Sequence, residues 1–245
     1  MAGKNDTFDI PTGLDDFFTE ATDKGEVVGA WGFNPDVDFT SMGHEETNVW
    51  FFEQVFNFLR AFFGVVMPDN MEITTYNASR QIRRDNLNQM TFLDELMLIM
   101  KGLTEPIWCI KLNLNIVGFL RTERDPDKQI RLQIQEPATF VVWGGPDETG
   151  FQIFSMGYRL FSEQKIKGEH SLLWSVNQPL LERALQKWER QSRHIIDVIE
   201  SNSKDLSLSR RGFARPAPSF ARPKPKPKET GPIQDSIPDL DDLLL

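Results

Sequence analysis

The sequence predicts an α+β domain with an antiparallel sheet of about four to six strands, two N-terminal helical regions and a long C-terminal helix, followed by a disordered tail. Apolar residues fill 46–66 almost continuously and recur at helical spacing over 178–206, whereas apolar and polar residues alternate over 110–116 and again over 129–135. After residue 206, Pro, Ser and basic residues replace the apolar ones, so the chain can no longer bury enough surface to fold. The 245 residues are 40% hydrophobic, which suffices for a sizeable core.

The first elements along the chain are a short strand and two helical regions. Residues 26–33 fit the strand. Residues 46–66 have apolar side chains on almost every side, as is typical of a buried helix, and Pro68 follows them. The region 79–103 ends near Gly102, which suits a helix C-cap. Its apolar stripe consists of Leu93, Leu96, Met97 and Met100.

The middle of the chain changes to a period of two. Four segments show the strand pattern in two hairpins, namely 107–121 with 129–135, and 138–143 with 151–161. Residues 170–176 are expected to add a further strand. The long helix over 178–206 comes last. Its apolar stripe is Leu181, Ala184, Leu185, Trp188, Ile195, Ile196 and Ile199.

Composition excludes several classes of protein. The single cysteine, Cys109, allows neither an intramolecular disulfide nor a cysteine-rich zinc site. The first residues lack the features of a signal peptide, and the longest apolar stretch is interrupted by polar side chains, so we expect a cytoplasmic protein (in the host cytoplasm if it is viral) without a membrane span. The net charge of −9 argues against a wholly basic nucleic-acid coat.

No pattern of residues indicates catalysis. His44, His170 and His194 are widely separated and match neither metal-ligand nor triad spacing, and no phosphate-binding loop is present. We therefore predict no catalytic residue, no metal site and no cofactor. An enzyme whose site is assembled from distant residues stays an alternative, because triads are spatial arrangements.

The tail has two halves of opposite charge. From Arg210 to Lys228 there are four Arg and three Lys without an acid, and from Glu229 to Leu245 there are five acids without a base. Four segments follow from these changes, namely an N-terminal arm (1–25), the globular domain (26–206), a basic Pro-rich disordered linker (207–232) and an acidic-hydrophobic tip (233–245).

Two regions combine cations with aromatic rings, which is the chemistry that holds a phosphate backbone and stacks bases. One is the polar face of the 107–135 hairpin, although any antiparallel sheet shows water a polar face. The other is the linker with its GFARP and SFARP repeat, for which a plain solubilising spacer is the alternative. A separate basic cluster in SRQIRR consists of Arg80, Arg83 and Arg84, for which the solvated start of a helix is the favoured alternative. The candidate nucleic-acid-binding residues are Arg80, Arg83, Arg84, Lys111, Asn113, Phe119, Arg121, Arg131, Arg210, Arg211, Phe213, Arg215, Phe220 and Arg222.

The sequence PDLDDLLL at 238–245 joins aspartates to leucines at the far end of the linker. Such a peptide can place its leucines in an apolar pocket while its carboxylates meet Arg or Lys around that pocket. A frayed acidic end does not explain four leucines. The candidate partner-binding residues are Ile237, Pro238, Asp239, Leu240, Asp241, Asp242, Leu243, Leu244 and Leu245.

A globular domain, a Pro-rich linker and an acidic-hydrophobic tip together resemble the layout of single-stranded-DNA-binding proteins. DLDDLL at 239–244 resembles the tail of those from large tailed bacteriophages, and DSIPDLDD at 235–242 resembles the tips of the bacterial ones. The resemblance covers about ten residues and the layout. It implies that the tip recruits replication or repair proteins and competes with DNA. Two departures are the single cysteine, which cannot build the zinc site of the phage family, and the helices that begin this domain, where the bacterial family has a five-stranded barrel.

The leading hypothesis is thus a non-catalytic single-stranded-DNA-binding or replication accessory protein. The alternative is a protein-only adaptor or assembly protein whose tip is a tethered ligand. LDDFF at Leu14–Phe18 is a near-copy of the tip and favours the adaptor slightly, since two such peptides would engage like pockets with avidity. The same residues would also suit a short helix that docks Phe17 and Phe18 on the chain's own core. The sequence leaves the oligomeric state and the identity of the partners open, with a homo-oligomer among the options.

Overall fold

The structure is a computed structural model. It describes residues 25–215 apart from the short stretches 77–80, 86, 88–90, 122–128, 147, 162–164, 167–168 and 171–172. The N-terminal arm up to residue 24, the linker beyond Arg215 and the whole tip lie outside the described residues.

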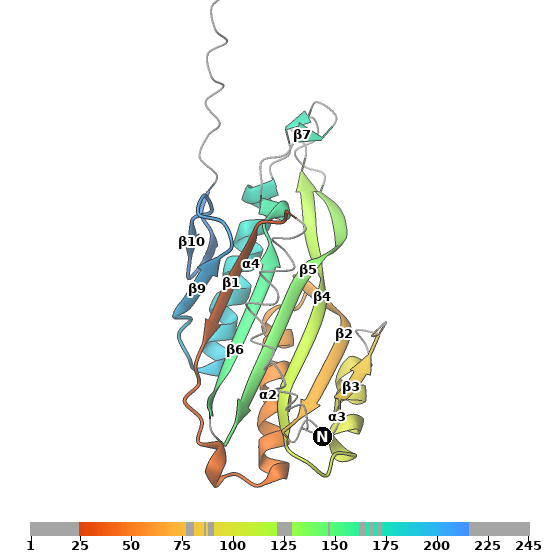
Figure 1. The fold of residues 1–245 in the computed structure, drawn as a ribbon. Coiled ribbons are helices and arrows are strands. Elements are labelled where there is room, and N and C mark those ends of the chain that lie inside the picture. The colour runs from red at the N-terminus through yellow and green to blue at the C-terminus, as the bar shows by residue number, and fades with distance from the viewer. Residues whose placement is uncertain are drawn as a thin grey trace, which may run out of the picture.

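One large antiparallel sheet organises the described residues, in the order β3-β2-β4-β5-β6-β1-β9. Figure 1 shows its long strands side by side, with the helices behind them. The strands are β1 (Val28–Phe33), β2 (Val66–Thr75), β3 (Gln81–Arg84), β4 (Ile107–Arg121), β5 (Gln129–Gly145), β6 (Glu148–Gly157) and β9 (Val198–Ser201). Two small hairpins are β7 (Lys165–Ile166) with β8 (Glu169–His170), and β10 (Leu208–Ser209) with β11 (Gly212–Phe213).

Three α-helices lie together on one face of the sheet (Figure 1). They are α2 (His44–Ala61), α3 (Phe92–Lys101) and α4 (Leu173–Ser192), and two single 3-10 turns are η1 (Phe39–Ser41) and η2 (Arg159–Phe161). Helix α2 packs beside α4 and beside α3. Its N-cap is Gly43, whose N–H donates to the Glu46 carboxylate at 3.1 Å, which is the half of a capping box that a glycine can form.

Aromatic rings fill the space between the helices and the sheet. Phe58 of α2 stacks on Phe140 of β5 with ring centroids 3.9 Å apart, and Trp188 of α4 meets both rings edge-on. Phe62 and Phe154 extend the cluster. All five side chains are fully buried, so the abundance of phenylalanine serves this core.

The antiparallel pairing of the expected hairpins is present, but the division into four strands is wrong. Residues 129–135 and 138–143 belong to the single strand β5, which pairs with both β4 and β6, and the strand expected over 151–161 ends at Gly157, before the turn η2. In β4 and β5, Ile116 lies opposite Ile134 and Arg121 opposite Gln129, and in β5 and β6, Trp143 lies opposite Phe151. Strand β1 also falls where the sequence placed it, and it is buried along its whole length between β6 and β9. The alternation of apolar and polar residues predicted these strands because one face of each strand packs against the helices.

The predicted fold class is wrong in the size of the sheet and in its N-terminal helices. The sheet has seven strands, not four to six. The expected helical region 79–103 contains the strand β3, and only Phe92–Lys101 is helical. The sequence also missed β2, where Pro68 and Asp69 suggested a break. Met71 and Ile73 of β2 are nevertheless fully buried, so pairing with β4 overrides the local signal.

The C-terminal helix is also shorter and earlier than predicted. Residues 173–176, expected in a strand, form the first turn of α4, and the helix ends at Ser192 instead of 206. Arg193 then takes a left-handed conformation with φ 62°, which stops the helix. Ile196 and Ile199, expected on the helix stripe, belong to the connection and to β9. Residues 207–215, expected in the linker, include the packed hairpin of β10 and β11.

Candidate functional site

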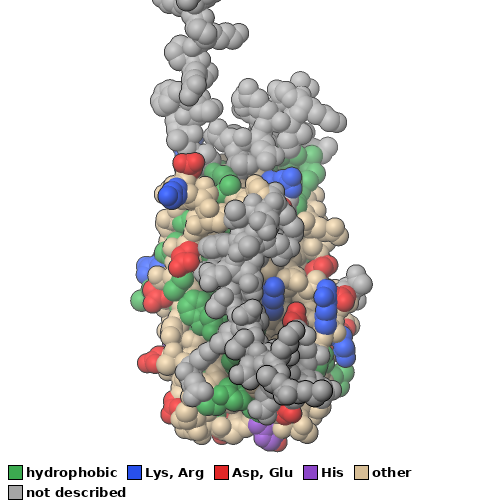
Figure 2. All heavy atoms as spheres, viewed as in Figure 1, with side chains coloured by type: hydrophobic (Ala, Val, Ile, Leu, Met, Phe, Trp, Pro, Cys, Tyr) green, Lys and Arg blue, Asp and Glu red, His purple; other side chains and the backbone are tan. Residues whose placement is uncertain are grey.

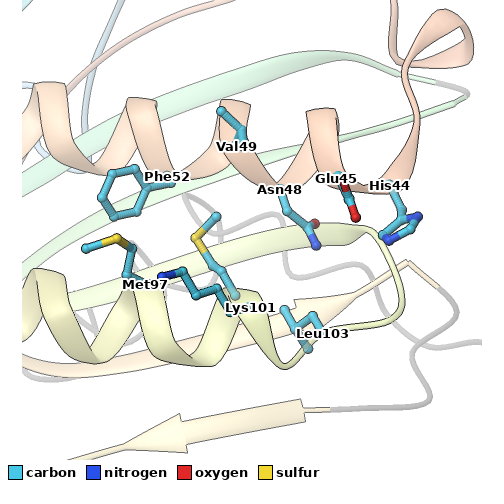
Figure 3. A pocket seen from close by; sticks show the side chains of 9 residues that line it. His44, Glu45, Asn48, Val49, Phe52, Met97, Lys101 and Leu103 are labelled. Atoms are coloured by element: carbon cyan, nitrogen blue, oxygen red, sulfur yellow. The ribbon is translucent and has the colours of Figure 1, made fainter.

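The first candidate site is the α2–α3 groove, a surface groove along the gap between α2 and α3. One end is a cleft of about 460 Å³. Figure 3 shows that side chains of both helices point into it, with Phe52 of α2 facing Met97 of α3. The residues lining this cleft are His44, Glu45, Asn48, Val49, Phe52, Met97, Met100, Lys101 and Leu103.

A second hollow of about 190 Å³ lies between the same two helices toward the other end of α2, and the α2–α3 groove comprises both hollows. It is lined by Phe56, Leu59, Arg60, Phe63, Val66, Pro68, Phe92 and Leu93. The start of α2 faces the end of α3 in the first cleft, and the end of α2 faces the start of α3 in the second. The two helices are therefore antiparallel, and the groove follows α2 over its whole length.

The walls of the groove are apolar and partly open to water. Exposed fractions are 53% for Val49, 37% for Phe56 and 39% for Met97, and Phe63 at the end of the groove is 77% exposed. Helix α2 is apolar all round because its other side, with Phe51 and Phe58, faces the core. Exposed apolar side chains that gather in one groove are typical of a site that binds another polypeptide.

Asn48 fixes the position of α2 at this site. Its amide oxygen accepts from the Ile107 N–H at 2.7 Å, and its amide nitrogen donates to the Glu105 carbonyl at 3.3 Å. Asn48 is buried, so these bonds tie α2 firmly to the start of β4. The groove therefore has a rigid wall, and its cationic residues are Lys101 in the last turn of α3 and Arg60 in the last turn of α2.

The second candidate site is the basic corner, which we define as Arg190, Arg193, His194, Arg210 and Arg211. Here the side chains of Arg210 and Arg211, from the turn between β10 and β11, reach Glu189 near the end of α4. A hollow of about 280 Å³ is lined by Glu189, Arg190, Arg193, His194, Ile195 and Arg210. Its one carboxylate, Glu189, lies 3.5 Å from the Arg210 Nε and 3.2 Å from an Nη of Arg211. Two arginines thus share this carboxylate, and among the described residues Arg190 and Arg193 add two further cations to the lining of the hollow.

Two features of the basic corner favour a ligand. Arg193 is one of two described residues other than glycine with a positive φ, a conformation that costs an ordinary side chain about 1 kcal/mol or more. The ring of His194 stacks on buried Phe33 with centroids 5.3 Å apart, and beside it Ile195 is 65% exposed. Cations therefore lie next to a flat ring and an exposed apolar side chain.

The structure does not gather the sequence-predicted nucleic-acid residues into one site. Arg83 and Arg84 lie on β3 at one edge of the sheet, whereas Arg210 and Arg211 lie past the opposite edge, beyond β9. Between them, Lys111 of β4 stands opposite Glu72 of β2. Figure 2 shows basic and acidic side chains mixed on this side of the molecule. Opposite charges on neighbouring strands stabilise the sheet, and they do not form a continuous basic surface that could follow a phosphate backbone.

The other predicted residues also have local roles. Arg83 lies 3.0 Å from Asp85, and the Asn113 side chain donates to that of Asn70 on β2. Phe119 and Arg131 face each other across the far part of the β4–β5 hairpin, near Arg121. Phe213 is 1% exposed and packs on Trp31 and Phe161, so its ring belongs to the core.

Some predictions concern parts of the chain that the structure leaves out. Arg215 is exposed at the end of the described region. The remaining candidates lie outside the described residues, namely Arg80, Phe220, Arg222, the partner-binding residues 237–245 and the Leu14–Phe18 segment.

Sequence reasoning missed most of both sites. The sequence predicted Arg210 and Arg211 as nucleic-acid-binding candidates but placed them in a disordered linker, and it did not indicate Arg190 or Arg193. The α2–α3 groove had one signal, which is that 46–66 is apolar on more sides than the core can cover.

Searches for metal and proton-transfer chemistry add little. Within the described residues no three His, Cys, Asp or Glu side chains lie close enough together to hold a metal ion. The hydroxyl and the N–H of Thr40 donate to Asp38 and lower the pKa of its carboxyl group, at an exposed turn outside both candidate sites. In the part of the chain that is described, no helix is long and apolar enough to cross a membrane.

Comparison of the chain with protein-family models, with curated proteins and with solved structures finds no match. The resemblance of the tail to single-stranded-DNA-binding proteins therefore stays a prediction.

Proposed function

We propose that this protein is a non-catalytic, single-stranded-DNA-binding accessory protein that recruits other proteins through its acidic tip. The basic corner carries the proposal, because its Arg210 and Arg211 stand a few residues before the end of the described chain. In sequence they are followed by Arg215, by Arg222 and by the three lysines of the linker. The folded domain and the tail therefore share one run of cations along the sequence.

The chemistry of the basic corner suits a single strand better than a duplex. Arginine binds phosphate oxygens with paired N–H groups. The ring of His194 and the side chain of Ile195 offer surfaces on which an unpaired base can lie, a contact that tolerates any sequence. The linker would follow the backbone of the nucleic acid away from the domain. Binding of this kind releases counterions and weakens as salt rises.

The test is fluorescence anisotropy of a labelled oligonucleotide titrated with the full chain over a range of salt concentrations. A single strand is expected to bind more tightly than its duplex, and log affinity is expected to fall linearly with log salt. A full-length variant with Asp239, Asp241 and Asp242 replaced by Asn is expected to bind more tightly, because the tip competes with DNA. If neither protein binds the single strand at low salt, the proposal fails.

A second candidate function is a protein-only adaptor, and the α2–α3 groove favours it. An apolar groove between two helices is the usual receptor for an amphipathic helix. In this alternative the groove would dock on one partner and the tip would catch another. Replacing Met97 by Asp would then abolish partner binding, whereas replacing the arginines of the basic corner would have no effect.

A further inference from the structure

We propose that the α2–α3 groove is a docking site for the C-terminal tip of this same chain. The tip's leucines would lie against the apolar walls of the groove, and its aspartates would face Lys101 or Arg60. This inference does not depend on DNA binding. It makes the tip a ligand that the folded domain holds until a partner competes for it.

The spacing of the leucines matches one side of a short helix. Leu240, Leu243 and Leu244 stand at positions i, i+3 and i+4, so a helical tip presents them on one face. At about 100° per residue, Asp239 and Asp241 stand at the two borders of that face, where they can meet cations at the rim of the groove, and Asp242 stands on the opposite side. Anchors at this spacing are what a groove between helices receives.

The dimensions of the groove agree with such a ligand. It runs beside α2 from His44 to Phe63, about 28 Å at 1.5 Å per residue. Eight residues in a helix need only about 12 Å. Met97 and Met100 line the larger cleft, and their unbranched side chains adapt readily to leucines of an incoming peptide.

The charges of the groove also suit an acidic ligand. Lys101 lines the first cleft and Arg60 the second, both exposed. Each stands in the last turn of its helix. Glu45 is the one carboxylate that lines either hollow, and it stands beside His44 at the start of α2. The aspartates of a docked tip would therefore meet more positive than negative charge.

The length of the tail allows the tip to reach the groove. Between Arg215 and Leu240 there are 25 residue steps. In an extended polyproline II form they would span about 78 Å, and as a flexible coil about 28 Å on average. The described chain ends beside β9, and β2, which lines the groove, is five strand positions or about 24 Å away across the sheet. Both lengths exceed this lateral distance. A tether of this kind holds its ligand at an effective concentration of about 1 mM, so even a weak peptide would occupy the site.

The N-terminal LDDFF segment has the same spacing but a shorter tether. Phe18 is seven steps from Gly25, which leads into β1, and seven residues span at most about 25 Å. Strand β1 is four strand positions from β2, or about 19 Å, and the helices form a separate layer. The segment would have to be fully extended and pass around α4 or the sheet edge, whereas the tip has ample length.

The experiment measures binding of a fluorescein-labelled peptide of residues 233–245 by fluorescence polarisation. The acceptor is the full chain with Leu240, Leu243 and Leu244 replaced by Ser, which leaves the groove without its own ligand. We expect this acceptor to bind the peptide saturably, and the wild-type chain to bind it at least tenfold more weakly, because the wild-type tip already occupies the groove.

Substitutions in the acceptor then locate the site. Met97→Asp is expected to weaken peptide binding at least tenfold, and Lys101→Glu several-fold, with partial recovery when the peptide carries Asp241→Lys and Asp242→Lys. The matched control is Leu98→Asp on the same helix, since Leu98 is 70% exposed and lines neither hollow. It is expected to leave binding unchanged. Near-ultraviolet circular dichroism checks that each variant is folded.

Four results would overturn the proposal. They are the absence of saturable binding to the acceptor, equal losses for Met97→Asp and Leu98→Asp, equal binding by wild type and acceptor, and tighter binding by a peptide of residues 10–20. The last result would assign the groove to the N-terminal segment. None of these measurements involves nucleic acid, so failure here is distinct from failure of the proposed function.

Discussion

Replacing Arg190, Arg193 and Arg210 together by Gln is expected to weaken the binding of single-stranded DNA and to flatten its dependence on salt. All three line the hollow of the basic corner. Glutamine keeps most of the side-chain length and removes only the charge. Arg211 stays in place, so Glu189 keeps the partner that lies 3.2 Å from it. The fold should be little affected, because the ion pair lost by Arg210 is partly exposed and such pairs contribute about 1 kcal/mol at most.

The size of the effect follows from counterion release. Each phosphate contact on a single strand contributes about 0.7 to the slope of log affinity against log salt, so three lost contacts reduce the slope by about 2. If the proteins bind equally well near 1 M salt, the variant is then about 100-fold weaker at 0.1 M. The difference between the two proteins should shrink steadily as salt rises.

Anisotropy titrations at four or more salt concentrations measure both slopes. The control is Arg83→Gln with Arg84→Gln on β3, at the opposite edge of the sheet. That variant should change the slope by less than about 0.5, because these arginines do not adjoin the basic corner. An unchanged slope in the triple variant, or an equal change in the control, would refute the assignment of the DNA site to this corner.

Three further predictions test the fold that supports these sites. Asn177→Leu should lower the free energy of unfolding, measured by urea denaturation, by about 3 kcal/mol or more. The buried Asn177 amide accepts from the Phe119 N–H at 2.7 Å, donates to the Phe119 carbonyl at 2.9 Å, and also donates to the carbonyls of Leu160 and Leu173. The control Gln186→Leu on the same helix should change this free energy by about 0.5 kcal/mol or less, and similar losses for both variants would contradict the reasoning. Gly32→Ala should lower the free energy of unfolding, measured by thermal denaturation, by about 1–3 kcal/mol, because the added Cβ would lie 2.5 Å from the Gln152 carbonyl oxygen. The control Gly43→Ala should leave it unchanged, because the space around Gly43 is open. The folded-state pKa of Asp38 is lowered, so the stabilisation from its hydrogen bonds with Thr40 is present above the pKa of the unfolded state and is lost as pH falls through the folded-state pKa. Asp38→Asn should therefore be less stable than the wild type near neutral pH and equally stable in acid. A stability difference that does not change with pH would contradict this prediction.

The predictable part of the fold is the part in which local pattern and tertiary packing agree. Alternation in β4 and β5 was visible because their inner residues, such as Leu112 and Phe140, meet the helices while their outer neighbours do not. Strand β2 was missed because Pro68 and Asp69 interrupt the pattern before its buried residues begin. Strand β3 has four residues, and Ile82 is the apolar one among them, too little for any period to show.

The end of α4 shows why periodicity alone misleads. Ile195, Ile196 and Ile199 continue the helical spacing of Leu185 and Trp188, so the sequence favoured one unbroken helix. The chain instead turns at Arg193, where no glycine marks the stop. Ile195 is left 65% exposed, and residues 198–201 pair with β1 as an added edge strand. The gain from completing the sheet edge outweighs the helical preference of a few residues.

The same turn at Arg193 creates the basic corner, which explains why the sequence could not reveal it. A continuous helix would have pointed Arg190 and Arg193 into water and carried residues 207–211 away from them. Because the chain reverses into β9 and then into β10 and β11, Arg210 and Arg211 return to Glu189 on α4. A cluster assembled from residues about 20 positions apart leaves no local motif.

Salt separates the two places where the acidic tip could be held. Attraction to the basic corner and the linker is electrostatic and weakens as counterions are added. Docking in the α2–α3 groove buries leucines, and burial of apolar surface persists at high salt. The wild-type chain should therefore keep its groove closed to the labelled peptide in 0.5 M salt, a concentration at which DNA binding is strongly reduced. Replacing the tip aspartates by Asn should affect mainly DNA binding, and replacing its leucines by Ser should affect mainly the groove. Under the two proposals the leucines of the tip act only in the groove, whereas its aspartates act at both surfaces, so the leucine and aspartate variants separate the two roles.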